Sequence, residues 1–334
     1  MKTNGARVIG VGSPIVDRLA LVEEAFLTTV GGNKGGMELV DTPSMEALLT
    51  RVPGEALVAP GGSAANTIFA LARLDIGAAL LGKLGDDKEG RYYRQTFEQL
   101  GGDGSRLKTC GVSATARCLS MVTPDSERTM RTDLGAAANF APDDVSVDDF
   151  RGCQHAHVEG YLLFNPDLAQ TVLNAAKTAG CTISLDLGAF EVVNGAAKIL
   201  PSLLDRYVDV VLANEDEAAA FCGRRDPLTG LKDLSEHCTT AVVKCGADGA
   251  LIRSGGKTYE TPAQNVDRVK DTTGAGDFWA AGFLYGLLND CTLDACGHLG
   301  SILGAQVVRH LGANLPSAAW DNVAADFKRY LEER

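Results

Sequence analysis

Residues 271–288, DTTGAGDFWAAGFLYGLL, place two threonines and two glycines in front of a long apolar segment. Residues 278–288 are apolar on nearly every side, which predicts a buried helix rather than an amphipathic surface helix. Gly274, Ala275 and Gly276 would then form the turn that enters this helix. Because the first N–H groups of a helix have no partner within it, the turn predicts an anion site reinforced by the helix dipole.

Asp277 follows this turn directly, in the first turn of the predicted helix. A carboxylate there can accept the proton of a substrate hydroxyl while neighbouring N–H groups stabilise charge on a transferring phosphoryl group. An aspartate at a helix start is more often only a cap. A cap does not need Gly-Ala-Gly in front of it, whereas a phosphate that approaches the backbone closely does need small residues. We therefore predict that Asp277 is a catalytic base.

A second glycine turn, GGSAAN at residues 61–66, leads into another predicted helix, with Ser63 as its expected N-cap. Gly61 and Gly62 would let a ligand lie against the backbone. Ser63 and Asn66 are one turn apart and could both reach the hydroxyls of a polyol. A strand-to-helix turn with a cap explains this segment equally well.

Two more segments follow predicted strands. Asn214 and Glu217 are three residues apart and share a helix face, where they can hold a hydrated Mg²⁺ that takes few protein ligands. For this segment alone, an acidic first turn that complements the helix dipole is the favoured explanation. Lys244 precedes a turn with Gly246 and Gly249, which predicts either a nucleotide cradle or an ordinary hairpin turn.

Apolar strands and helices alternate along much of the chain. Strands are predicted at residues 7–12, 182–187, 207–213 and 241–244, another closes at Val158, and a helix is predicted at residues 168–179. This alternation predicts βαβ units. The expected fold class is therefore α/β, with a doubly wound, mostly parallel sheet flanked by helices.

Two regions break this rhythm because they lack clear crossover helices: residues 16–58 and 112–133. The second has two alternating stretches around a turn at Pro124-Asp125, which is a hairpin pattern. We predict that both regions form one small β lid over the carboxyl edge of the main sheet. The large domain would then comprise residues 1–15, 59–111 and 134–334.

Composition narrows the class of protein. The 334 residues carry a formal net charge of −12, which argues against a nucleic-acid partner. The sequence has no run of about 18 apolar residues, so it predicts no membrane-spanning helix. The apolar stretch at the start is too short for a secretory signal, and we expect a cytoplasmic protein. The nine cysteines are expected to be reduced thiols. His155 and His157 alternate along one strand and are expected to be structural rather than metal ligands.

The four segments occur together and in this order, and the set resembles the PfkB (ribokinase-like) family. Residues 271–277 are similar to the family's C-terminal signature, residues 61–66 to its N-terminal glycine motif, and residues 214–217 to its Asn-x-x-Glu motif. The resemblance covers nearly the whole chain. It implies a ribokinase-like fold with a small β lid, ATP and Mg²⁺ as cofactors, and transfer of the γ-phosphoryl group to a primary hydroxyl.

The resemblance also implies roles for single residues. Asp277 would be the base, and Gly274, Ala275 and Gly276 the anion hole. ATP would be bound by Asn214, Lys244, Gly246, Gly249 and Thr272, with Mg²⁺ held through water by Glu217 and Asn214. Asp271 and Thr273 match the pattern of a monovalent-cation site, for which K⁺ is the candidate.

Within the family the chain is most similar to adenosine kinases. Residues 12–17 resemble their opening segment, whose aspartate, here Asp17, grips ribose hydroxyls, and residues 134–139 resemble a stretch that lines their nucleoside pocket. Arg128 would lie near the transferred phosphate. The implied substrate-binding residues are Asp17, Gly61, Gly62, Ser63, Asn66, Met37, Ala136 and Tyr161.

Two departures leave the base preference open. Tyr161 stands where Phe is expected in adenosine kinases, and Ser13 replaces their usual Asn. The alternatives are an inosine or guanosine kinase, a kinase of ribose, fructose or a related sugar, and a non-catalytic sensor of a nucleoside or sugar. The expected partners are a small-molecule substrate and ATP, in a monomer or homodimer.

Overall fold

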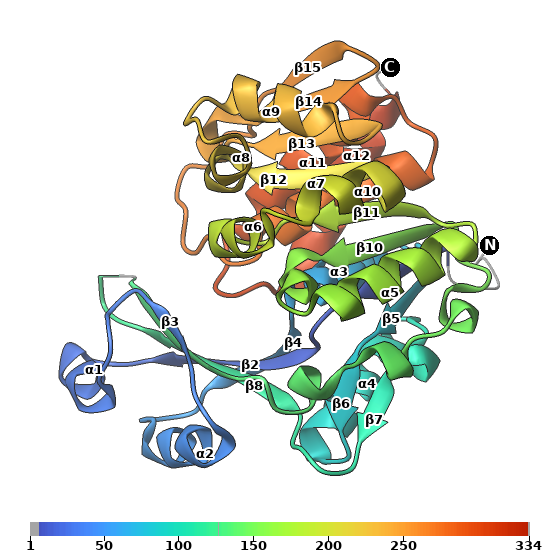
Figure 1. Cartoon of the computed structure of the whole chain (residues 1–334). Helices are drawn as coiled ribbons and strands as arrows, with labels where there is room; N and C mark the ends of the chain where they lie inside the picture. Colours follow the sequence, from blue (N-terminus) through green and yellow to red (C-terminus); the bar gives the residue numbers. More distant parts are fainter. Residues whose placement is uncertain (1–6, 126, 333–334) are drawn as a thin grey trace.

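The computed structural model describes residues 7–125 and 127–332, and its centre is an eight-stranded sheet (Figure 1). The sheet order is β15-β14-β13-β12-β11-β10-β1-β5. The strands are β1 (Val8–Val11), β5 (Ala78–Leu81), β10 (His155–Glu159), β11 (Thr182–Asp186), β12 (Val210–Asn214), β13 (Thr240–Lys244), β14 (Ala250–Ser254) and β15 (Lys257–Thr261). Neighbours from β5 to β13 pair parallel, and β14 and β15 are antiparallel. The predicted α/β class is confirmed.

Helices cover both faces of this sheet, as the continuous apolar strands require. One layer contains α5 (Pro166–Thr178), α6 (Phe190–Ala196), α7 (Leu200–Tyr207), α8 (Glu215–Cys222) and α9 (Pro227–Ser235). The other contains α3 (Ser63–Arg73), α4 (Lys88–Gln99), α10 (Ala275–Leu288), α11 (Leu293–Val307) and α12 (Ser317–Glu332). The predicted buried helix is α10, which has nine buried residues.

One predicted strand is shifted. The strand expected at residues 207–213 begins only at Val210, because Tyr207 is the last residue of α7. Leu200, Leu203 and Leu204 are buried at helical spacing with Tyr207, and this packing decides for the helix.

A second sheet, β3-β9-β8-β2-β4, extends away from the main body (Figure 1). Its strands are β2 (Ile15–Leu21), β3 (Met37–Leu39), β4 (Leu57–Gly61), β8 (Ala116–Val122) and β9 (Arg128–Asp133), and β8 and β9 form the expected antiparallel hairpin. Its role as a lid and the domain limits stay predictions. Two helices that the sequence did not predict, α1 (Glu24–Val30) and α2 (Thr42–Arg51), pack on one of its faces.

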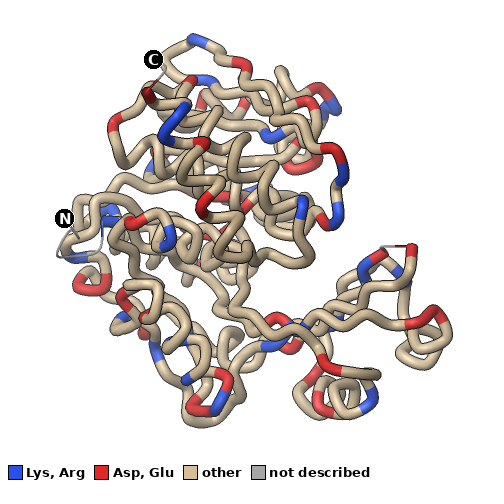
Figure 2. The backbone as a smooth tube through the Cα atoms, turned by 180° about the vertical axis from the view of Figure 1, so that it is seen from behind, with Lys and Arg blue, Asp and Glu red and all other residues tan. Residues whose placement is uncertain are grey.

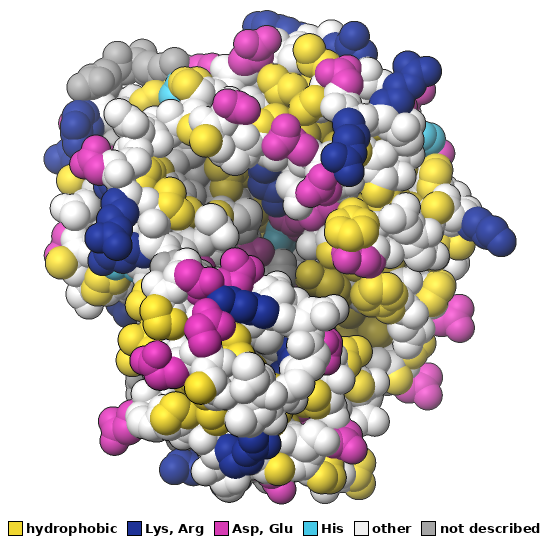
Figure 3. Space-filling view, turned by 90° about the vertical axis from the view of Figure 1, so that its left-hand side faces the viewer, with side chains coloured by type: hydrophobic (Ala, Val, Ile, Leu, Met, Phe, Trp, Pro, Cys, Tyr) yellow, Lys and Arg dark blue, Asp and Glu magenta, His cyan; other side chains and the backbone are white. Residues whose placement is uncertain are grey.

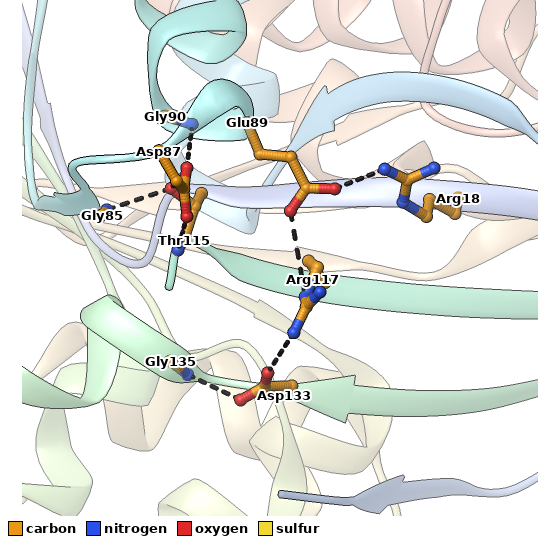
Figure 4. A network of polar contacts seen from close by, with 9 residues as sticks. All are labelled: Arg18, Gly85, Asp87, Glu89, Gly90, Thr115, Arg117, Asp133 and Gly135. Atoms are coloured by element: carbon orange, nitrogen blue, oxygen red, sulfur yellow. Dashed lines mark hydrogen bonds and ion pairs between the residues drawn. The ribbon is translucent and has the colours of Figure 1, made fainter. Parts of the chain in front are cut away.

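A network of charged side chains ties this second sheet to the main body (Figure 4). Glu89, near the start of α4, pairs with Arg18 of β2 and lies 3.8 Å from Arg117 Nε of β8. Arg117 also donates to Asp133 Oδ2 at 3.1 Å. One residue of α4 therefore holds two strands of the second sheet. Nearby, Asp87 caps α4 and accepts from the backbone N–H of Thr115 at 2.7 Å.

The remaining elements are short. β6 (Lys83–Gly85) and β7 (Lys108–Cys110) pair parallel, and short 3-10 turns include η2 (Gly135–Asn139), η5 (Gly160–Phe164) and η6 (Gly246–Asp248). Acidic and basic residues are interspersed along the whole chain trace (Figure 2). Within residues 7–125 and 127–332, no helix has the length and apolarity that crossing a membrane requires.

Candidate active site

The start of α10 has the turn that the sequence predicted. Gly274 is the N-cap with a φ of +73°, a left-handed conformation that favours glycine. The N–H of Ala275 donates to the Thr272 carbonyl at 3.1 Å, so it is already used. For the N–H groups of Gly276 and Asp277, no acceptor is recorded among residues 7–125 and 127–332. These two groups therefore carry the donor capacity of the predicted anion site.

The carboxylate of Asp277 is held by the start of α3. Ser63 Oγ donates to Oδ1 at 2.9 Å and Asn66 Nδ2 donates to Oδ2 at 2.8 Å. Thr67 Oγ1 donates to the Asp277 carbonyl at 3.0 Å. The prediction of Ser63 as an N-cap was wrong, because the N-cap is Gly62 and the Ser63 hydroxyl turns toward Asp277 instead. The two glycine turns thus meet at one carboxylate.

The environment of Asp277 suits a general base. Burial raises the pKa of Asp277 to about 6, and the charge of Asp186 acts in the same direction. The hydrogen bonds from Asn66 and Ser63 and the ammonium of Lys244 oppose this rise. The carboxylate is therefore ionised at neutral pH but has a pKa close enough to 7 to exchange a proton readily.

Asp17 lies on β2 close to this centre. A Cβ on Gly61 would collide with its carboxylate, so only glycine leaves room for it there. Burial raises the pKa of Asp17 to about 7, with Arg128 opposing the rise and Asp277 adding to it. The negative charges of Asp17 and Asp277 are therefore close enough to repel each other.

Glu159, the last residue of β10, belongs to the site although the sequence reasoning missed it. Its side chain accepts from the backbone N–H of Ser13 at 2.7 Å and of Ala64 at 3.2 Å. Burial raises the pKa of Glu159 to about 7. It therefore fixes the chain after β1 against the start of α3.

Asn214 and Glu217 form a reciprocal capping box at the start of α8. Asn214 N and Nδ2 donate to the two Glu217 oxygens, and Glu217 N donates to Asn214 Oδ1, each at 2.8 Å. Burial, and then the charge of Asp186, raise the pKa of Glu217 to about 7. Asn214 and Glu217 thus have a structural role at the start of α8. They can also bind the waters of a metal ion, since each carboxylate oxygen can accept a second hydrogen bond.

The side-chain oxygens of Asn214 and Glu217 fit an Mg²⁺ ion held through water better than a directly bound metal ion. Among the residues that the structure describes, no group of three or more His, Cys, Asp or Glu side chains could hold a metal ion. Mg²⁺ prefers oxygen ligands and keeps several waters, and the oxygens of Glu217 and Asn214 can accept hydrogen bonds from those waters.

Lys244, at the end of β13, donates to Asp186 Oδ2 at 2.7 Å. Burial opposes the charge on Lys244, but Asp186, Glu217 and Asp277 together raise its pKa. Asp186, at the end of β11, was also missed. The signal was available, because Glu159, Asp186, Asn214 and Lys244 each end a strand, and ligands of open α/β sheets bind outside the carboxyl ends of the strands. Figure 3 shows acidic, basic and histidine side chains at the bottom of a hollow there.

Arg128 of β9 forms an ion pair with Asp271, just before the α10 turn. The Asp271 carboxylate also accepts from the N–H groups of Gly312 at 2.7 Å and Thr273 at 3.0 Å. Arg128 and Gly312 both contact Oδ2 of this carboxylate, whereas Oδ1 accepts only from Thr273 among the described residues. The cation site and the phosphate contact of Arg128 both stay predictions.

For the remaining predicted residues, no hydrogen bond to Asp277 is found among the residues that the structure describes. Met37 is half exposed on β3, Ala136 is buried in η2, and Tyr161 of η5 donates to the Gly188 carbonyl at 3.3 Å. Gly246 and Gly249 bound the turn between β13 and β14, both with positive φ, and Thr272 is exposed. Their substrate and ATP contacts stay predictions.

A buried hydrogen-bond chain runs along β10 and β11 below the site. Thr182 Oγ1 donates to the Gln154 carbonyl, so it must accept from His155 Nδ1 at 2.8 Å. His155 Nε2 then accepts from Ser184 Oγ, and Ser184 accepts from His157 Nδ1, both at 2.8 Å. Burial lowers the pKa values of His155 and His157 to about 3 and 4, so both rings are neutral at pH 7.

Comparison with known proteins places this geometry in a family. The family model for pfkB family carbohydrate kinases matches residues 50–320. An ATP-dependent ribose-1-phosphate kinase of Halopiger xanaduensis is 31% identical over 274 residues, 82% of this chain and 87% of that protein.

Two solved structures are similar over nearly the full length. A probable sugar kinase from Rhizobium etli CFN 42 has a TM-score of 0.86 and 31% identity, covering 96% of this chain and 98% of that chain. An adenosine kinase from Sinorhizobium meliloti has a TM-score of 0.85 and 31% identity, covering 96% of this chain and 99% of that chain.

Proposed function

Because the chain belongs to the pfkB family of carbohydrate kinases, which are phosphotransferases acting on hydroxyl groups, we propose that it phosphorylates the 5′-hydroxyl of adenosine with ATP. The products are AMP and ADP, a reaction of purine salvage, and we propose that it takes place in the cytoplasm. One observation carries the proposal: Asp277 is held by Ser63 and Asn66, and the N–H groups of Gly276 and Asp277 beside it have no acceptor among the residues that the structure describes.

The proposed step is an in-line displacement at the γ-phosphorus. The 5′-oxygen forms a bond to phosphorus while the bond to the β–γ bridging oxygen breaks, and that electron pair leaves on ADP. The hydroxyl proton passes to the Asp277 carboxylate. The N–H groups of Gly276 and Asp277 stabilise the charge on the phosphoryl oxygens in transit. Asp17 accepts hydrogen bonds from the ribose hydroxyls and orients the 5′-carbon toward Asp277.

The ATP side of the site lies along the neighbouring strand ends. Asn214 and Glu217 would hold Mg²⁺ through its waters, and the ion neutralises charge on the ATP phosphates when it is bound. The turn with Gly246 and Gly249 would receive the nucleotide. Both glycines have positive φ, and a Cβ on Gly246 would meet nothing within 4 Å, so this side of the turn has room for a ligand.

A ribosyl acceptor is supported by the relatives. Adenosine kinase, ribose-1-phosphate kinase and aminoimidazole riboside kinase, which are 28% to 31% identical to this chain, are all named for substrates that contain ribose. Tyr161, half-buried beside Gly188, offers an aromatic face for a purine. A sugar kinase is the second candidate, because a fructokinase and a probable sugar kinase are also similar to this chain.

The base assignment is tested with Asp277→Asn, which keeps the shape of the side chain. We expect kcat to fall by about 10²–10⁴, because removal of a general base costs that much. The dissociation constant of adenosine, measured by calorimetry, should change by less than about tenfold. A kcat within tenfold of the parent would refute the role of Asp277.

The acceptor is tested by ADP release with adenosine, inosine, guanosine, ribose and fructose. The proposal expects the highest kcat/KM with adenosine. Turnover of a free sugar in preference to every nucleoside would favour the second candidate. No turnover together with a raised melting temperature in adenosine would indicate a sensor.

A further inference from the structure

Asp186 and Lys244 form a buried ion pair that the displacement step above leaves unused. They end β11 and β13, so the pair reaches across β12, and Nζ lies 2.7 Å from Oδ2. The side chains are only 5% and 12% exposed. A buried ion pair is weak evidence for stability, since desolvation offsets most of the attraction. Stability alone therefore does not explain why the pair is buried.

The ammonium of Lys244 lies against the first turn of α10. A Cβ built on Gly276 would be 3.3 Å from Nζ. The same turn carries the N–H groups of Gly276 and Asp277 that have no recorded acceptor in the described part of the chain. Asp186 is the one hydrogen-bond acceptor recorded there for Nζ, which leaves two ammonium N–H groups for a ligand.

We propose that Lys244 is a catalytic residue that contacts the γ-phosphoryl group during transfer, and that Asp186 is the positioning residue that holds its ammonium there. The proposal rests on the kinase function proposed above and deepens it. Lys244 keeps its protons throughout the step, and its positive charge stabilises the phosphoryl oxygens together with the helix N–H groups. Asp186 is needed because a lysine side chain is flexible and its point charge is not oriented by the chain itself.

The charges around the pair give it a second, measurable effect on Asp277. Glu217, His157 and Asp277 face the pair, and Asp17, Glu159 and Tyr161 also face Asp277. His157 is neutral at pH 7, because burial lowers its pKa. Lys244 lowers the pKa of Asp277 and Asp186 raises it. Removal of Lys244 should therefore raise the pKa of Asp277, and removal of Asp186 should lower it.

Kinetics of Lys244→Met, Asp186→Ala and the double variant test the proposal. We expect Lys244→Met to lower kcat by about 10²–10³, as loss of one transition-state donor does, with a smaller effect on KM for ATP. Asp186→Ala should lower kcat by about 10–100-fold, as loss of an orienting partner does. In the Lys244→Met background, Asp186→Ala should cost less than about threefold, because a positioning residue has nothing left to position.

The pH profile separates this role from a structural one. The acid limb of kcat/KM should move to higher pH in Lys244→Met and to lower pH in Asp186→Ala, with Asp186→Asn as the substitute if the alanine variant does not fold. Limbs that move together, or additive losses in kcat, would overturn the positioning role of Asp186.

Binding of tripolyphosphate, followed by thermal shift, needs no turnover. Lys244→Met should weaken it at least tenfold. Lys108→Met, which breaks the partly buried pair of Lys108 with Asp149, should bind tripolyphosphate as the parent protein does.

If the parent protein is active and Lys244→Met keeps kcat within threefold, Lys244 is not catalytic and the kinase proposal stands. If the parent phosphorylates no acceptor, the kinase proposal fails, and unchanged tripolyphosphate binding in Lys244→Met would also overturn the phosphate contact.

Discussion

At the scale of single residues, Gly274 and Gly223 have the same φ of +73° in different surroundings. A Cβ on Gly274 would lie 2.6 Å from Ala313 Cβ, whereas a Cβ on Gly223 would meet nothing within 4 Å. Gly223→Ala should therefore show only the conformational cost of a left-handed alanine, about 1–2 kcal/mol. Gly274→Ala should cost about 1–3 kcal/mol more, because the overlap forces the backbone to shift.

Urea unfolding of the two variants measures this difference, and kinase activity provides the control. Gly274→Ala should also lower kcat, since it moves the N–H groups of Gly276 and Asp277, while Gly223→Ala should leave kcat unchanged. Equal losses of stability in the two variants would mean that Ala313 moves aside without a measurable cost in free energy.

At this scale the sequence predicted a Gly-Ala-Gly turn at the start of a buried helix, and the structure has this turn. The anion site and the base that the turn indicated stay predictions. Ser63 was misassigned because a serine hydroxyl caps a helix and binds a carboxylate equally well, and only the tertiary contact with Asp277 decides between the two. Asp186 was missed because its partner Lys244 lies 58 residues away in the sequence.

At the scale of elements, the histidine chain between β10 and β11 depends on one hydroxyl. Ser184 Oγ bonds both His155 and His157 inside the sheet. Ser184→Ala leaves two buried ring nitrogens unpaired, which should destabilise the protein by about 1–3 kcal/mol. Ser301→Ala is the matched control, because Ser301 is also buried but its hydroxyl has no partner in the described residues.

Chemical denaturation of both serine variants checks this prediction. Ser301→Ala should be neutral or slightly stabilising, since it removes an unsatisfied polar atom. A loss in Ser184→Ala no larger than in Ser301→Ala would contradict the directed chain of hydrogen bonds.

Elements buried on both faces were predictable, and elements of the second sheet were less so. The apolar strands and the buried helix α10 had strong patterns. Helix α2 was missed although Asp41 caps it, because only Met45 and Leu48 are buried along its ten residues. Such a helix is specified by the sheet beneath it rather than by its own periodicity.

At the scale of the whole molecule, Glu89 connects the two sheets through Arg18 and Arg117. Glu89→Gln removes the carboxylate partner of Arg18 and one of the two carboxylate partners of Arg117, which keeps Asp133, and this should cost about 1–3 kcal/mol. The control on the same segment is Asp86→Asn, which breaks the exposed pair of Asp86 with Arg91 and should cost less than about 1 kcal/mol.

Thermal unfolding at two salt concentrations tests this connection. The effect of Glu89→Gln should persist at high salt, since buried pairs are screened less than exposed ones. Melting temperatures that fall equally in both variants would show that Glu89 does not anchor the second sheet.

The contact between α3 and α10 also has a consequence for biosynthesis. Asn66 and Asp277 are 211 residues apart in the chain. At roughly 5–20 residues per second, a ribosome needs about 10–40 s to add the second partner after the first. During that interval the nascent chain already contains the residues of the glycine turn before α3 but lacks Asp277, the proposed base. The contact between Asn66 and Asp277 therefore forms only after about 211 further residues have been added, and a nascent chain that stops before Asp277 lacks the proposed base.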